Sequence, residues 1–114
     1  MPTDQLSRAF AALADPTRRD LVARLTLGDA TVSELAAPYA MSLQAVSKHL
    51  TVLEKAGIVT RHNRAPRQPV HLEPAVLAPL TDWLETHRRR AEERYQRLDA
   101  LLADMSEPPT GAPS

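Results

Sequence analysis

The chain has 114 residues, of which 43% are apolar and 25% charged, and its 14 basic and 14 acidic residues give a formal net charge of zero. This length and composition are typical of one compact globular domain. Because cysteine is absent, disulfides, thiolate metal ligands and a cysteine nucleophile are excluded.

The first residues, MPTDQLSRAF, are polar and do not form a basic segment followed by an apolar one, and no apolar run is long enough to span a bilayer. We therefore expect a cytoplasmic protein with no membrane partner. Only 3 residues are glycine and 4% are aromatic, which favours a mainly helical fold over an all-β one.

The zero net charge hides a local asymmetry along the chain. Residues 1–41 have four basic and five acidic residues, residues 42–72 have five and one, and residues 73–114 have five and eight. The three segments therefore carry charges of −1, +4 and −3. A positive central segment is typical of a protein whose middle element faces phosphate groups.

Capping residues and helical apolar spacing predict the first two helices. Thr3 can cap a first helix with Leu6 and Phe10 on its inner face. In ADPTRRDLVARLTLG, Asp15 and Pro16 begin a second helix, which ends by Gly28. Its predicted inward residues are Leu21, Val22 and Leu25.

Two further helices follow, a short one and a longer one. Thr31 and Glu34 form the capping-box pattern at the start of the short helix, and Pro38 ends it after about two turns. Ser42 caps the longer helix, which runs to Ala56 and is closed by the next residue, a glycine, in the left-handed conformation.

The rest of the chain begins with a predicted hairpin over residues 58–72, with the sequence RAPR between its two strands. Pro69 has no amide hydrogen, so its strand should be an edge at that position. A long helix then starts at Pro74 or Pro79 and ends near Met105. We expect one domain over residues 1–105 and a disordered tail over residues 106–114, which are rich in proline and small residues.

This order of elements predicts a mainly α fold with a small β-hairpin wing, a winged helix-turn-helix, in which the helix after the turn enters the DNA major groove. On a helical wheel, that helix, residues 43–56, has one apolar side and one polar side. The apolar side comprises Leu43, Val46, Leu50 and Leu53. The opposite side comprises Gln44, Lys48, Thr51 and Lys55, flanked by Ala45 and Ser47.

The polar side carries the side chains that DNA recognition requires. The amide of Gln44 matches adenine N6 and N7, Ala45 is small enough to touch a thymine methyl group, and Ser47 can bond to either kind of base atom. Ser42 at the helix start and Lys48 suit phosphates. The predicted DNA contacts of this helix are Ser42, Gln44, Ala45, Ser47, Lys48 and Thr51. The alternative interpretation is a solvated face of an ordinary amphipathic helix.

Four stretches, ALADPTRRDLVARL, VSELA, MSLQAVSKHLTVLEKAGIVTR and HLEPAVLAPLTDWL, together resemble the ArsR-type winged helix-turn-helix repressors. The resemblance covers about residues 5–102 and points to the branch that lacks cysteine metal sites. It implies a homodimeric DNA-binding repressor with residues 61–68 as the wing. The family often has proline where this chain has Gln44, and usually glycine at the wing tip where it has Ala65 and Pro66.

Three arginines, Arg61, Arg64 and Arg67, are predicted to line the wing and to meet phosphates or the minor groove. Ordinary solvated charge is the alternative. His62 and His71 in the same hairpin need no metal to explain them. His49 can either pack against the domain or touch a phosphate.

Metal sensing occurs in this family, and its known ligand sets do not match this sequence. The short third helix reads SELAAP, without cysteine, and DWLETHRRRAEE has Leu84 where the family's Asp-x-His motif places histidine. Asp82, His87 and Glu92 do not converge on one point of a helix. We expect no metal site and no cofactor.

The last helix carries a long apolar stripe that one small domain cannot cover, so we expect a homodimer. The resemblance implies pairing through the first and last helices. The predicted interface comprises Leu6, Phe10, Leu80, Trp83, Leu84, Tyr95, Leu98 and Leu101. Packing of part of the stripe within its own chain is the alternative. A two-fold dimer would place its recognition helices about 34 Å apart, which predicts an inverted-repeat operator.

The sequence contains no nucleophile elbow, phosphate-binding glycine loop or convincing catalytic set, so an enzyme is not expected. The predicted function is a sequence-specific transcriptional repressor whose partners are double-stranded DNA and a second copy, with control of its own gene included. Two alternatives remain. One is a repressor that senses a small organic inducer at the dimer interface near Trp83, and the other is a winged-helix module that binds protein.

Overall fold

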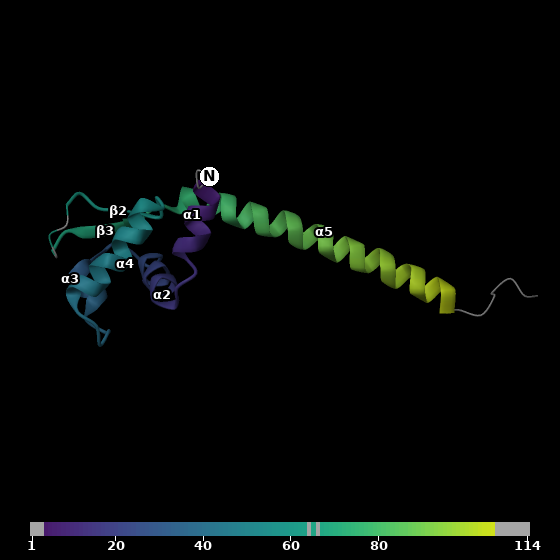
Figure 1. Cartoon of the computed structure of the whole chain (residues 1–114), viewed down its shortest axis with the longest axis horizontal. Helices are drawn as coiled ribbons and strands as arrows, with labels where there is room; N and C mark the ends of the chain where they lie inside the picture. Colours follow the sequence, from purple (N-terminus) through teal and green to yellow (C-terminus); the bar gives the residue numbers. More distant parts are fainter. Residues whose placement is uncertain (1–3, 64, 66, 107–114) are drawn as a thin grey trace, which may run out of the picture. The chain divides into compact units, whose positions relative to one another are not determined.

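The computed structural model describes residues 4–63, 65 and 67–106. The chain divides into two units, Met1–Leu80 and Thr81–Ser114. The described part of the first unit contains four complete helices, three strands and the start of a fifth helix, which are labelled in Figure 1 except for β1. The second unit contains the remainder of that helix.

Two capped helices open the first unit. Helix α1 spans Gln5–Ala12, and its N-cap is Asp4, whose carboxylate accepts a hydrogen bond from the Ser7 amide at 2.6 Å. The N-cap predicted from the sequence, Thr3, lies outside the described residues. Helix α2 spans Pro16–Leu25 and is capped by Asp15, as predicted. Aspartate is effective at both starts because its carboxylate satisfies an amide that has no partner within the helix.

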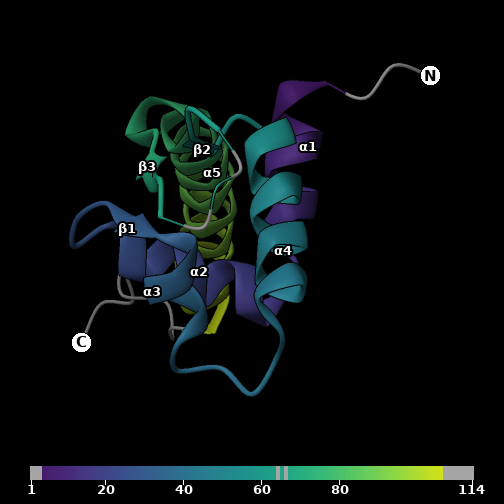
Figure 2. The same ribbon diagram turned by 90° about the vertical axis from the view of Figure 1, so that its left-hand side faces the viewer.

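The helix-turn-helix consists of α3, Val32–Ala36, and α4, Leu43–Lys55. Thr31 and Glu34 form the predicted capping box, and Ser42 caps α4 by accepting from the Ala45 amide at 3.1 Å. Gly57 follows α4 with a φ of +78°, a conformation that favours glycine. Figure 2 shows α4 running beside α1, which it contacts.

The turn between α3 and α4 is attached to α2 by polar side chains. The guanidinium of Arg24 donates to the carbonyl oxygens of Leu35 at 2.7 Å and Glu34 at 3.0 Å, at the end of α3. The same guanidinium lies 5.7 Å from the ring centre of Tyr39, whose hydroxyl donates to Asp20. These contacts connect the end of α3 and the turn that follows it to α2.

The described strands form one antiparallel sheet in the order β1-β3-β2, with β1 at Ala30–Thr31, β2 at Val59–Thr60 and β3 at Pro69–Leu72. The predicted hairpin is confirmed as β2 and β3, paired through Val59 with Leu72 and Thr60 with His71. Strand β1 was not predicted from the sequence. It makes β3 the middle strand of the sheet.

Pro69 is accommodated because pairing along β3 is staggered. It lies opposite Thr31 of β1, whereas the pairs formed with β2 involve only His71 and Leu72 of β3. Pro69 offers no amide hydrogen, and the Thr31 amide donates instead to the Glu34 carboxylate at 2.9 Å. The Thr31–Pro69 pair therefore requires no backbone hydrogen bond.

The hydrophobic core lies among the helices and the sheet of the first unit. Its largest fully buried side chains are Leu21, Leu35, Val46, Leu50, Leu53, Ile58, Val59 and Val70. Leu43 was placed on the apolar face of α4, but it is 39% exposed because it occupies the first residue of the helix, beyond the core. The inward positions Val46, Leu50 and Leu53 are confirmed.

Helix α5 spans Pro74–Ser106, so it extends one residue past the predicted boundary of the domain. Within the second unit, Arg88 donates to Glu85 at 2.7 Å and also pairs with Glu92. The Trp83 and His87 rings stack with their centroids 4.2 Å apart. Among the helices of the described residues, none is long and apolar enough to cross a membrane.

Candidate nucleic-acid interface

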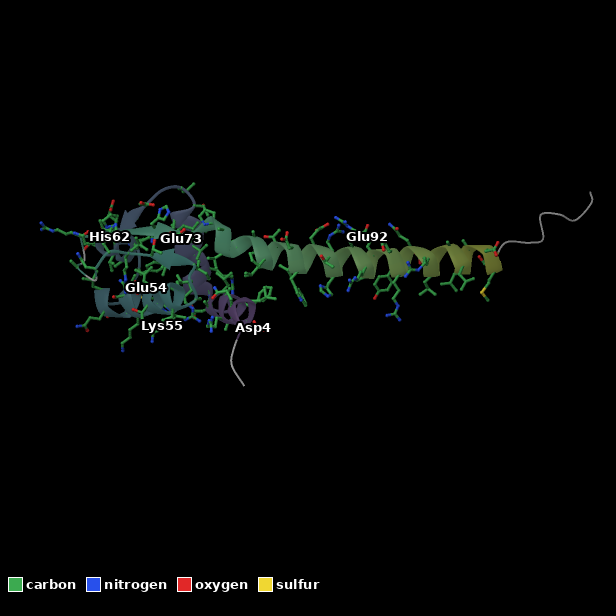
Figure 3. The ribbon with its side chains drawn as sticks, turned by 90° about the horizontal axis from the view of Figure 1, so that it is seen from above. Asp4, Glu54, Lys55, His62, Glu73 and Glu92 are labelled. Atoms are coloured by element: carbon green, nitrogen blue, oxygen red, sulfur yellow. The ribbon has the colours of Figure 1, made fainter. Side chains whose placement is uncertain are left out.

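The outward side of α4 is the candidate surface for reading DNA. Gln44 and Lys48 are exposed, and Ala45, Ser47 and Thr51 are half-buried beside them. Lys55 lies on the same helix with its side chain pointing away from the first unit (Figure 3). The structure thus brings the predicted base-reading residues to one accessible side of one helix.

The Ser42 hydroxyl caps the start of α4 and can also contact a phosphate. Its hydroxyl oxygen accepts from the Ala45 amide, so this amide is committed to the cap and is not available to a phosphate. The hydroxyl can still donate its own hydrogen to a phosphate oxygen. Ser42 therefore fixes the start of α4 and can contact the DNA backbone with the same group.

Arg61 directly follows β2. It was predicted to line the wing and meet DNA, but its side chain is not exposed there. Its side chain is 1% exposed and turns back onto α4, where it donates to Thr51 Oγ1 at 3.0 Å and to Ser47 Oγ at 3.4 Å. Its Nε lies 3.6 Å from the Glu54 carboxylate, which is too long for a hydrogen bond but close enough for an ion pair. Arg61 connects the start of the wing to the recognition helix.

Both partners of Arg61, Thr51 and Ser47, were also predicted to contact DNA. The Thr51 hydroxyl donates to the Ser47 carbonyl oxygen at 3.0 Å and accepts from Arg61. Ser47 uses one acceptor position for the same guanidinium. The geometry gives both residues a structural role within α4, and their contacts with bases remain a prediction.

We predict that replacing Arg61 by glutamine destabilises the first unit. The substitution removes two hydrogen bonds from a charged donor and the ion pair with Glu54, at a cost of about 1–3 kcal/mol in the free energy of unfolding. Urea titration monitored by circular dichroism measures it. Arg67→Gln is the matched control, because Arg67 is exposed, and it should change stability by less than about 0.5 kcal/mol. Equal stability of the two variants would argue against this role.

His49 packs against Arg18 of α2 and the N-cap of that helix, as one of its two predicted positions requires. Its Nδ1 lies 3.3 Å from the guanidinium of Arg18 and 3.8 Å from the Asp15 carboxylate. The Arg18 amide, with a smaller contribution from His49, lowers the pKa of Asp15. His49 thus links α4 to the capped start of α2.

The base of the wing carries a second polar cluster. His71 Nδ1 lies 2.9 Å from the Asp29 carboxylate, and its Nε2 lies 3.9 Å from Glu73. The hydrogen bond with Asp29 raises the pKa of His71 above the ordinary 6.5. The resulting stabilisation is complete below that ordinary value and is lost as the pH rises through the raised folded-state pKa.

Of the other residues predicted for the wing, some lie among the described residues and some lie outside them. Arg67 is exposed, as a phosphate contact requires. Arg64 lies outside the described residues, as does Pro66 at the expected wing tip. Within the described ranges, no group of three or more His, Asp or Glu side chains is placed to hold a metal ion.

The predicted dimer residues differ in accessibility within their own chain. Leu80 is only 6% exposed and belongs to the core of the first unit, so a partner has little of it to cover. Leu6 and Phe10 pack partly against the same core. The exposed large apolar residues of α5 are Trp83, Leu84, Tyr95, Leu98, Leu101, Leu102 and Met105. Leu102 and Met105 are not among the predicted interface residues.

Comparison with known proteins identifies the matching domain. The family model for a helix-turn-helix domain matches residues 13–62, which include α2, α3 and α4. The HTH-type transcriptional regulator Rv2034 of Mycobacterium tuberculosis is 42% identical over 91 residues, covering 80% of this chain and 85% of the relative. The transcriptional repressor SdpR of Bacillus subtilis is 29% identical over 79 residues, covering 69% and 88%.

Solved structures agree with this match. The ArsR family transcriptional regulator RHA00566 is 38% identical, with a TM-score of 0.71, and the similarity covers 78% of this chain and 98% of that one. The homodimeric winged helix-turn-helix DNA-binding domain of Mb0332 from Mycobacterium bovis is 25% identical, with a TM-score of 0.59, covering 80% and 84%. The predicted fold, mainly α with a small β wing, is confirmed.

Proposed function

The chain belongs to the ArsR family of winged helix-turn-helix transcriptional regulators, and we propose that it is a homodimeric repressor that binds an inverted-repeat operator. The proposal rests on one observation: α4, the capped second helix of the helix-turn-helix, has an exposed polar side. We propose Gln44 as the principal base-reading residue and Lys48 as a phosphate contact.

Repression follows from occupancy of DNA by a dimer. SdpR, a relative over most of this chain, is a transcriptional repressor, and a repressor needs only to bind its operator tightly enough to block transcription. We propose that the operators include one in front of the chain's own gene. DNA as the partner also favours the cytoplasm as the site of action.

The dimer is proposed from the exposed apolar side chains of α5 and from the homodimeric state of Mb0332. Six large apolar residues of the second unit, from Leu84 to Met105, are at least 47% exposed. These residues fall on one side of a helical wheel, and an exposed apolar surface of this kind is typical of an interface between subunits. In a dimer with two-fold symmetry, the two recognition helices lie about 34 Å apart, and each contacts one half of an inverted repeat.

The proposal is tested by titrating the protein against a duplex from upstream of its own gene and against a scrambled duplex, at two salt concentrations. We expect the native duplex to bind about 10³-fold more tightly or better, the range of specific binders. Fluorescence anisotropy measures both affinities. Equal, salt-sensitive binding of the two duplexes would contradict recognition of that site and would favour a protein-binding role instead.

The wing arginines give a separate prediction. Replacing Arg67 by glutamine should weaken binding to native and scrambled duplexes alike, because phosphates carry no sequence information. The slope of log affinity against log salt concentration should become smaller by about 0.9 for each phosphate that the protein no longer neutralises. Arg64→Gln should act in the same way, and Arg89→Gln on α5 serves as the control. An unchanged salt slope would show that the substituted residue does not bind a phosphate.

A further inference from the structure

A surface groove lies between α1, the start of α2 and α4, and none of its lining residues is among the predicted DNA contacts. It is open to solvent and has a volume of about 340 Å³, within the range of small-molecule sites. Its apolar residues are Ala11 and Ala12 of α1, Val52 of α4, and Ala56, which caps the end of α4. Its cationic residues are Arg8, Arg18 and Lys55, and none of the acidic residues in the described part of the chain lines it.

The groove exists because small side chains face one another across two helices. Ala12 and Ala56 are almost fully buried and form its floor, whereas a larger pair at these positions would fill the space. Val52 is 40% exposed at its wall. Exposure of this apolar side chain to water is unfavourable, and an apolar ligand in the groove would cover it.

The cationic edge of the groove is partly fixed before any ligand arrives. Arg18 donates through Nε to the Ala12 carbonyl oxygen at 2.5 Å, through Nη2 to the Ala11 carbonyl oxygen at 3.5 Å, and through Nη1 toward His49. These contacts use three of the five hydrogens that an arginine can donate, and two remain. A guanidinium held in this way is well suited to a carboxylate.

We propose that this groove binds an amphipathic organic anion, specifically a medium-chain carboxylate, with its chain along the alanine floor and its carboxylate at Arg18 and Lys55. The apolar floor matches an alkyl chain and the cationic edge matches one negative charge. A DNA phosphate would use the cations and leave the apolar floor without a partner, so the lining favours the carboxylate.

The proposal is tested by calorimetric titration of the full chain with sodium decanoate, below the concentration at which it forms micelles. One decanoate should bind per chain, and octanoate should bind about fourfold more weakly, because each half-buried methylene contributes about twofold. Acetate tests the carboxylate without the chain, and decyltrimethylammonium tests the chain with the opposite charge. Neither should bind.

Matched variants then locate the site. Ala11→Trp fills the groove and should weaken decanoate binding about tenfold or more, whereas Ala23→Trp places the same ring on an exposed site of α2 and should have no effect. Lys55→Gln should weaken binding several-fold, whereas Lys48→Gln, on the same helix but outside the groove, should not. Amide shifts in NMR spectra should cluster at Ala11, Ala12, Val52 and Ala56.

Three results would overturn the proposal: no binding of decanoate, equal binding of the cationic analogue, or binding that Ala11→Trp leaves intact. A smaller salt slope for DNA binding in Lys55→Gln, together with no binding of decanoate, would identify the cations as phosphate contacts instead. The titrations contain no DNA, so their failure would leave the proposed repressor function unaffected.

Discussion

Replacing Leu98 and Leu101 together by glutamate is expected to convert the protein from a dimer to a monomer. Both side chains are about half-exposed on the apolar stripe of α5, and a partner that covers them would have to bury two carboxylates without counter-charges. Size-exclusion chromatography with light scattering should give the mass of one chain. Affinity for an inverted repeat should fall by about 100-fold or more, because each half-site then binds independently.

The matched control places the same two charges on another side of the same helix. Gln96 and Ala100 are exposed on α5 and lie away from the stripe on a helical wheel. The Gln96→Glu, Ala100→Glu variant should therefore remain dimeric and keep its operator affinity. Loss of the dimer in both variants would indicate a general charge effect, and a dimer that survives in both would place the interface elsewhere.

Replacing Gln44 by alanine is expected to remove about 1–3 kcal/mol of discrimination at the operator, which is about 5-fold to 150-fold in affinity. An exposed amide at the second residue of α4 can donate and accept to one adenine edge, and alanine can do neither. Binding to a scrambled duplex should stay nearly unchanged, because that affinity comes from phosphates. Competition titrations with both duplexes measure the difference.

Two controls separate this role from general damage. Gln96→Ala removes the same amide from an exposed position of α5 and should affect neither duplex. Lys48→Ala removes a charge from the same face of α4 and should weaken both duplexes about equally. If Gln44→Ala also weakened both equally, Gln44 would contact the backbone and some other residue would read the bases.

Local structure that depends on neighbouring residues could be predicted from the sequence. The caps of α2, α3 and α4 at Asp15, Thr31 and Ser42 are confirmed. Each of these caps is formed by a side chain and an amide three residues later in the chain. Such a signal lies within one turn and does not depend on the rest of the fold.

The features that were missed depend on residues far apart in the chain. Strand β1 has only two residues and pairs with β3 about forty residues later, so no periodicity could reveal it. Arg61 was assigned to the wing by its charge, but its partners Thr51 and Ser47 lie ten and fourteen residues earlier. An arginine that binds phosphate and one that braces a helix look alike in a sequence.

Thr31 belongs to the sheet and to the helix-turn-helix at once. Its backbone lies opposite Pro69, while its hydroxyl accepts from the Glu34 amide at 3.1 Å and its own amide donates to the Glu34 carboxylate. Inserting or deleting one residue between Gly28 and Val32 would therefore disturb the register of β1 and the first turn of α3 together. Natural variants should keep the length of this segment even where evolution has changed its residues.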